Sequence, residues 1–181
     1  MRSSSCVIGI LLLFAMSAFA EVKDAAAGGF TIVHSFTVKG APDEVYRKIT
    51  LVGNWWSSDH TYSGDAHNLT LDAKAGGCWC EKLPKAGGSV AHMQVATAWP
   101  GTLLVMTGGL GPLQSMGASG AMTFKLTAAG EDTKVEFTYV VSGYSPQGMS
   151  AIAPAVDGVL MGAMKRLQAY IETGNPAKES K

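Results

Sequence analysis

The sequence predicts an α+β domain: a curved antiparallel sheet of seven strands wrapped on one long C-terminal helix, with two short helices after the first strand. Three observations support this class. Residues 30–38 alternate between apolar and polar side chains, short β-type segments separated by turn residues fill residues 69–142, and apolar side chains recur at helical spacing over residues 150–173. A sheet with one apolar face must bury that face, and the terminal helix is the obvious cover.

The first strand is predicted over residues 30–38, because every second side chain from Phe30 to Val38 is large or apolar, with His34 among them. Pro42 is followed by two acidic residues, which is typical of the first turn of a helix. Residues 54–57 begin a second short turn or helix.

Six further strands are expected, and the segments between them are short and rich in glycine or proline. Such loops favour an antiparallel meander in which neighbours in sequence pair. The six strands are predicted at residues 69–73, 77–83, 89–99, 102–107, 120–128 and 133–142.

The last element is predicted as a helix over residues 150–173, with Pro154 in its first turn and Gly174 as its left-handed cap. Its apolar stripe would face the sheet. The small residues Gly158, Gly162 and Ala163 would enlarge the space between helix and sheet.

The N-terminus has the pattern of a secretory signal peptide over residues 1–20: Arg2, an apolar run, and a small-x-small site ending at Ala20. We therefore expect a periplasmic or secreted protein without a membrane span in its mature chain. Residues 21–29 are expected to be a flexible leader, residues 30–174 the domain, and residues 175–181 a disordered tail.

The amino-acid composition excludes some classes of protein and favours others. Hydrophobic residues make up 47% and charged residues 15% of the chain, so the chain is not a disordered one. Lysine plus arginine equals aspartate plus glutamate, 14 each, which leaves no basic excess for a nucleic-acid partner. Low charge and nine methionines suggest a chain that buries or binds apolar matter.

Three features carry a family resemblance: GAPDEVYRKITLVGNWW near the start, AGGCWCEKL in the middle, and the terminal helix. Together they resemble a secreted member of the SRPBCC (START-like, helix-grip) superfamily, in its polyketide-cyclase and heat-shock-ATPase-activator-like branch. The resemblance implies a deep apolar cavity between sheet and helix. Members of the superfamily include lipid and hormone binders, aromatic cyclases, ring-hydroxylase subunits and co-chaperones, so it does not select one activity.

A register argument concerns Glu81 and His92. If Leu83 pairs with Val90 across the loop between two strands, Glu81 lies opposite His92, and the two side chains can form a hydrogen bond. Inside a cavity such a pair could serve as a general base with its orienting carboxylate. The alternative is an ordinary cross-strand ion pair on the outer face, and a one-residue slip would abolish the pairing.

Cys78 and Cys80 flank Trp79 on a predicted strand, so both cysteines share one face. Three interpretations are open for the pair: two packed free thiols, a strained disulfide, or half of a metal site. No metal site is predicted, because two cysteines supply half a tetrahedral set. Asp59, His60, Asp65 and His67 show no recognised spacing either.

His34 is either a satisfied core histidine or a polar anchor for a ligand. The remaining candidates are aromatic, leucine and methionine side chains that would line the cavity, or else simply pack in the core. They are Trp55, Trp56, Tyr62, Trp79, Met106, Leu110, Leu113, Met122, Tyr139, Leu160 and Met164.

The sequence thus predicts a protein that binds or transports a small hydrophobic or amphipathic molecule, such as a lipid, an isoprenoid or an aromatic polyketide, without a cofactor. The alternatives are a cyclase or isomerase that uses Glu81 and His92, and an envelope interaction module without a ligand. Oligomeric state is not predicted.

Overall fold

The computed structural model describes residues 21–177. The expected signal peptide, residues 1–20, lies outside the described residues, as do the last four residues of the expected tail.

The sheet is antiparallel throughout and has eight strands, one more than predicted, in the order β1-β2-β8-β7-β6-β5-β4-β3. Strands β3 to β8 form a meander in which neighbours in sequence pair. β1 and β2 form a hairpin, and β2 pairs with β8 with the register Phe30↔Val141. The strands are β1 Glu21–Ala26, β2 Gly29–Lys39, β3 Leu69–Leu71, β4 Cys78–Leu83, β5 Gly88–Trp99, β6 Leu103–Gly108, β7 Ser119–Ala129 and β8 Asp132–Ser142.

The additional strand, β1, corrects the expectation of a flexible leader over residues 21–29. It pairs antiparallel with β2 through a tight turn, with Ala26 opposite Gly29 and Val22 opposite Ile32. The segment KDAAAGG carries little apolar alternation, because an edge strand is held mainly by backbone hydrogen bonds on one side.

One short helix, α1 (Pro42–Thr50), follows β2 as predicted, with Pro42 in its first turn. The second predicted short helix is wrong: this stretch consists instead of three 3-10 turns, Val52–Asn54, Ser58–His60 and Ala66–Asn68. No helix among residues 21–177 is long and apolar enough to cross a membrane.

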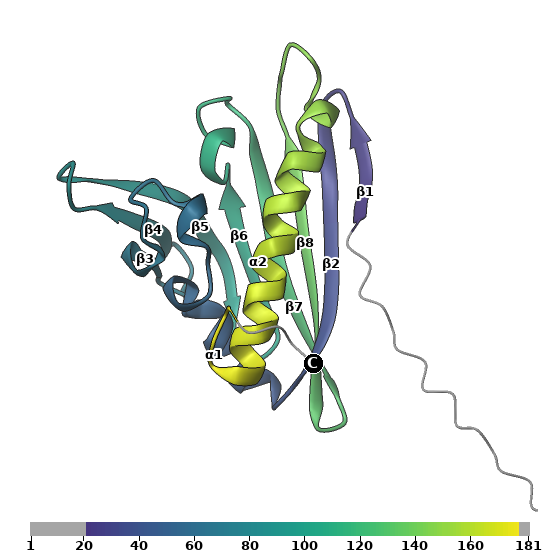
Figure 1. The fold of residues 1–181 in the computed structure, drawn as a ribbon. Coiled ribbons are helices and arrows are strands. Elements are labelled where there is room, and N and C mark those ends of the chain that lie inside the picture. The colour runs from purple at the N-terminus through teal and green to yellow at the C-terminus, as the bar shows by residue number, and fades with distance from the viewer. Residues whose placement is uncertain (1–20, 178–181) are drawn as a thin grey trace, which may run out of the picture.

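The long helix α2 (Ala153–Thr173) begins three residues later than predicted, after a 3-10 turn at Met149–Ala151. Gly174 caps it in the left-handed region at φ 74°, as expected. Figure 1 shows α2 crossing the inner face of the curved sheet, with β1 and β2 at one side and the β3–β4–β5 end projecting at the other.

The helix contributes Leu160, Ala163, Met164 and Leu167 to the same buried hydrophobic core as the inner face of the sheet. Gly158 and Gly162 do not face the sheet: both are exposed, and a Cβ on either would meet nothing within 4 Å. The expectation that these two glycines enlarge the internal space is therefore wrong.

Candidate functional site

A cavity of about 460 Å³ lies between α2, the β4–β5 hairpin and two loops, and most of its wall is apolar. One loop follows α1 and the other follows β6. The lining residues are Trp56, Asp59, His60, Thr61, Tyr62, Leu69, Trp79, His92, Leu110, Gly111, Pro112, Leu113, Met116, Ile152, Ala155, Val156, Val159 and Leu160.

The structure divides the predicted lining residues into two groups. Trp56, Tyr62, Trp79, His92, Leu110, Leu113 and Leu160 line the cavity. The others do not: Trp55, Met106, Met122, Tyr139 and Met164 are buried in the hydrophobic core, where their size serves packing.

Sequence reasoning missed two parts of the wall. One is formed by Ile152, just before α2, and by Val156 and Val159 in its N-terminal half, which line the cavity beside the predicted Leu160. The helical spacing of apolar side chains was visible in the sequence, but this spacing does not distinguish residues that line a cavity from residues that pack in the core. The other is the polar mouth of the cavity, formed by Asp59 and His60.

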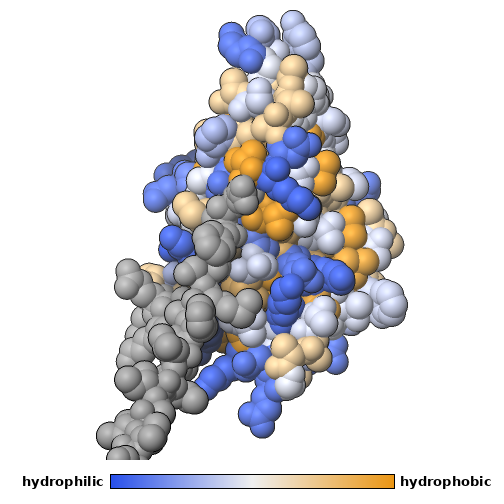
Figure 2. Space-filling model, turned by 90° about the vertical axis from the view of Figure 1, so that its right-hand side faces the viewer, coloured by the Kyte–Doolittle hydropathy of each residue, from blue (hydrophilic) through white to orange (hydrophobic). Residues whose placement is uncertain are grey.

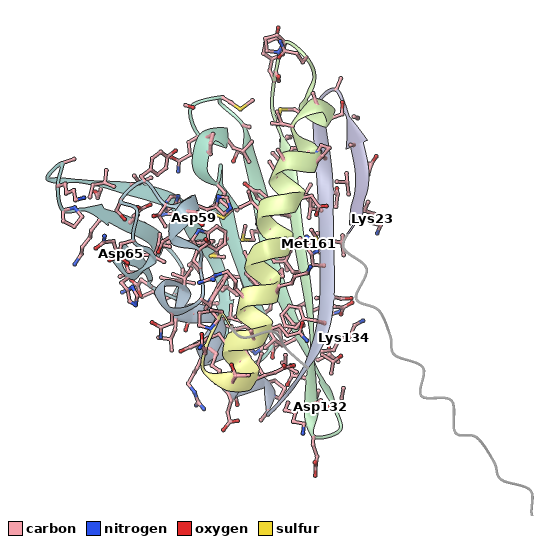
Figure 3. All side chains as sticks on the ribbon, in the orientation of Figure 1. Lys23, Asp59, Asp65, Asp132, Lys134 and Met161 are labelled. Carbon is pink, nitrogen blue, oxygen red and sulfur yellow. A yellow bond between two sulfur atoms is a disulfide. The ribbon has the colours of Figure 1, made fainter. Side chains whose placement is uncertain are left out.

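Figure 3 shows on which side of α2 the cavity lies. Asp59, a lining residue, is on the β4–β5 side of the helix, whereas Met161, which does not line the cavity, is on the side toward β2.

Glu81 and His92 form the polar centre of this region. Nε2 of His92 lies 2.9 Å from Oε2 of Glu81, and both side chains are buried. The predicted hydrogen bond is present. The predicted register is wrong, because Glu81 pairs with Val90 and Leu83 with Gly88.

A β-bulge in β5 explains how the pair still forms. Trp79 pairs with Met93 and Cys80 with Ala91, so His92 is the extra residue of β5 and has no direct partner in β4. The bulge turns His92 and Met93 both inward, where alternation allows only one of them. His92 therefore reaches Glu81 diagonally.

The carboxylate of Glu81 is held in its ionised form. Burial raises the pKa of Glu81, but hydrogen bonds from Ser63, His92 and the backbone N–H of Tyr62 together lower this pKa below its ordinary value. Because a carboxylate only accepts, Nε2 of His92 carries the proton that it donates. In the neutral imidazole, Nδ1 then holds a lone pair, and it has no hydrogen-bond partner among the described residues.

Aromatic rings surround the imidazole. Trp79 lies 6.1 Å from His92 between ring centroids, and Tyr62 stacks on it at 6.0 Å with an interplanar angle of 23°. Nε1 of Trp79 is buried without a hydrogen-bond partner in the described chain. Tyr62 is 56% exposed, so it covers His92 from the solvent side.

Hydrogen bonds fix the two loops of the wall. The hydroxyl of Tyr139 accepts from the N–H of Leu110 at 3.1 Å and donates to the carbonyl of Gly108 at 3.2 Å. Arg166 of α2 donates to the carbonyls of Trp55 and Trp56 at 2.9 and 3.2 Å. Tyr139 therefore acts on the cavity through the rim loop rather than by lining it.

His34 does not line the cavity. Its Nε2 lies 3.0 Å from Oδ1 of Asp157 on α2, close enough for an ion pair but not aligned as a hydrogen bond. Burial lowers the pKa of His34 more than the neighbouring Asp157 raises it. The histidine thus belongs to the contact between β2 and α2, and the expected role as a ligand anchor in the cavity is not supported by its position.

Cys78 and Cys80 are joined by a disulfide. A regular strand would separate their Cα atoms by about 6.5–7 Å, whereas here the Cα atoms are 5.3 Å apart. The register shift of the ladder between Trp79 and Cys80 marks the same irregularity, which the sequence does not reveal. Of the other candidate metal ligands, Asp65 and His67 bond to each other at 2.9 Å in an exposed turn.

Several solved structures share this fold. A conserved protein of unknown function from Enterococcus faecalis matches with a TM-score of 0.58 and 15% identity, over 92% of this chain and 84% of its own. The Aha1 protein of Colwellia psychrerythraea, solved as a dimer, matches with a TM-score of 0.56 and 17% identity, over 80% of this chain and 97% of its own. DynU16, a protein in the dynemicin biosynthetic locus, matches with a TM-score of 0.55 and 20% identity, over 82% of this chain and 49% of its own.

No protein-family model and no curated protein matches the sequence. At these sequence identities, the similarity to solved structures shows the fold alone. They are consistent with the SRPBCC-like, helix-grip fold that the sequence resembles, and they assign no activity.

Proposed function

We propose that this protein binds an apolar or amphipathic small molecule in the cavity between α2 and the β4–β5 side of the sheet. The cavity carries the proposal: about 460 Å³ is the volume of a small-ligand site, and its wall is mainly aliphatic and aromatic. Burial of apolar ligand surface would supply most of the affinity. An interaction module without a ligand would have no use for such a cavity.

A neutral fluorophore that brightens in apolar surroundings, N-phenyl-1-naphthylamine, tests this function. We expect saturable binding of one molecule per chain. Val159→Trp, which fills the cavity from α2, should weaken this binding by about tenfold or more.

The matched control is Gly158→Trp, one residue earlier on the same helix, where the side chain points into open space. It should bind the fluorophore like the parent. Equal affinity of both variants, or no saturable binding by the parent, would refute the proposed site.

A second candidate function follows from one specific observation, the buried pair of Glu81 and His92 at the cavity wall. With Nε2 bonded to the carboxylate, Nδ1 is the atom that would take a proton from a bound substrate, as in a cyclase or isomerase. His92→Ala separates the two functions: a binder keeps binding with altered affinity, whereas an enzyme loses turnover by orders of magnitude.

We also propose that the protein works outside the cytoplasm, as the signal-peptide pattern indicates, where a Cys78–Cys80 disulfide persists. The denatured mass of protein recovered from a bacterial periplasm should equal that of residues 21–181 less two hydrogens. The mass of the uncleaved chain would contradict this location.

A further inference from the structure

Two buried polar atoms, both on side chains that line the cavity, lack a hydrogen-bond partner among the described residues. They are Nδ1 of His92 and Nε1 of Trp79, on side chains that are 5% and 2% exposed. The other buried atoms without a partner lie elsewhere: His34 and Asp157 face each other, and Tyr46 does not line the cavity. A buried polar atom without a partner costs stability, so each one calls for an explanation.

The two atoms are complementary. Trp79 offers an N–H that can only donate. The neutral imidazole of His92, with its other nitrogen donating to Glu81, offers a lone pair that accepts. Their rings lie 6.1 Å apart between centroids, in adjacent strands. A single group that both donates and accepts matches the hydrogen-bonding need of both atoms. Turning Tyr62, which is stacked on the imidazole and half exposed, would give such a group access.

The charges around the cavity disfavour an anionic head group. No lysine or arginine belongs to the described wall, whereas Asp59 stands at the mouth and ionised Glu81 lies directly behind His92. A carboxylate or phosphate would meet these acidic groups without a lysine or arginine in the wall to compensate them. An ammonium group has no lone pair to accept from Trp79.

On the face shown in Figure 2, hydrophobic residues form small groups among hydrophilic ones rather than one broad apolar patch.

We infer that the ligand is an uncharged hydrophobic molecule with a hydroxyl group, either alcohol or phenol, that donates to Nδ1 of His92 and accepts from Nε1 of Trp79. This inference rests on the proposed function, because it names the chemical class of ligand for the same cavity.

Four probes with one ring system test it by calorimetric titration: 2-naphthol, 2-methoxynaphthalene, naphthalene and 2-naphthoate. The first can donate and accept, the second only accepts, the third does neither, and the fourth is an anion. We expect 2-naphthol to bind about tenfold tighter than 2-methoxynaphthalene, because only 2-naphthol satisfies His92. Naphthalene should bind more weakly than either, and 2-naphthoate weakest of all.

Two variants assign the contacts. His92→Phe should abolish the preference for 2-naphthol over 2-methoxynaphthalene while naphthalene still binds. Trp79→Phe keeps an aromatic ring and breaks no hydrogen bond among residues 21–177. It should abolish the preference for 2-methoxynaphthalene over naphthalene. Trp55→Phe is the matched control, because Nε1 of Trp55 donates to Ile49 outside the cavity and the preferences should persist.

The outcomes separate the two proposals. If the neutral probes bind with equal affinity, or if 2-naphthoate binds tightest, the hydroxyl inference is overturned while the cavity remains a binding site. If Trp79→Phe and His92→Phe leave every preference unchanged, the assigned contacts are wrong. If no probe binds the parent protein, the proposed function falls together with the inference.

Discussion

At the residue scale, buried titratable groups concentrate at two places, and both link distant parts of the chain. Glu81 ties β4 to the loop after α1 and to His92 in β5, and His34 ties β2 to Asp157 in α2. The first pair stands at the cavity and the second stands apart from it. Only the first therefore enters the proposed chemistry, whereas the second contributes to the docking of the helix.

The position of His34 predicts how stability depends on pH. Burial lowers its pKa in the folded chain, so folding favours the neutral imidazole. The contribution of His34 is fully present above the unfolded pKa of about 6.5 and is lost as the pH falls through the lower folded pKa.

The free energy of unfolding of the parent protein should therefore decrease between pH 7.5 and pH 5, as measured by urea denaturation. His34→Gln, which does not titrate in this range, should show a smaller decrease. An identical decrease in both proteins would mean that other groups govern the acid sensitivity.

At the element scale, the strands and the terminal helix were predictable because their side chains repeat with the period of their secondary structure. Phe30 to Val38 and the stripe of α2 are examples. Features that depend on backbone pairing were not predictable. β1 lacks an alternating pattern, and the extra residue at His92 leaves no mark in the sequence, so the register was missed although the contact between His92 and Glu81 was found.

For the candidate site, burial of the side chains was predictable, but their division between cavity and core was not. Large side chains near the sheet were recognised as buried, but Trp79 lines the cavity and Met106 packs in the core, and both are buried apolar residues. The difference depends on how far α2 stands from each strand, which is a tertiary property. The contact between His34 and Asp157 joins residues 123 positions apart in sequence and has no local signal either.

The two exposed glycines of α2 allow a test at this scale. A methyl group at Gly158 or Gly162 meets no atom within 4 Å, so the helix can accept alanine at both positions. Each substitution should raise the free energy of unfolding by about 1 kcal/mol, because glycine is the less favourable residue in a helix interior. Ligand affinity should not change. A destabilising effect in urea denaturation would show that the helix surface is covered by something at these positions.

At the scale of the whole molecule, a curved sheet is crossed by a long helix (Figure 1). The cavity adjoins the hydrophobic core, and Trp56, Trp79 and Leu160 belong to both. The rim is held by Tyr139 and by Arg166, so the opening is framed by side chains that reach it from β8 and from α2. The core thus stabilises the fold while the cavity remains available to a ligand.

The most direct measurement of the central claim uses the four tryptophans as reporters in one experiment. Trp79 and Trp56 line the cavity, Trp55 is buried outside it, and Trp99 is exposed on the surface. Indole ¹H–¹⁵N resonances recorded by NMR during titration with N-phenyl-1-naphthylamine should shift for Trp79 and Trp56. Those of Trp55 and Trp99 should stay in place. Shifts confined to Trp99, or no shift at Trp79 under saturating probe, would contradict ligand binding in this cavity.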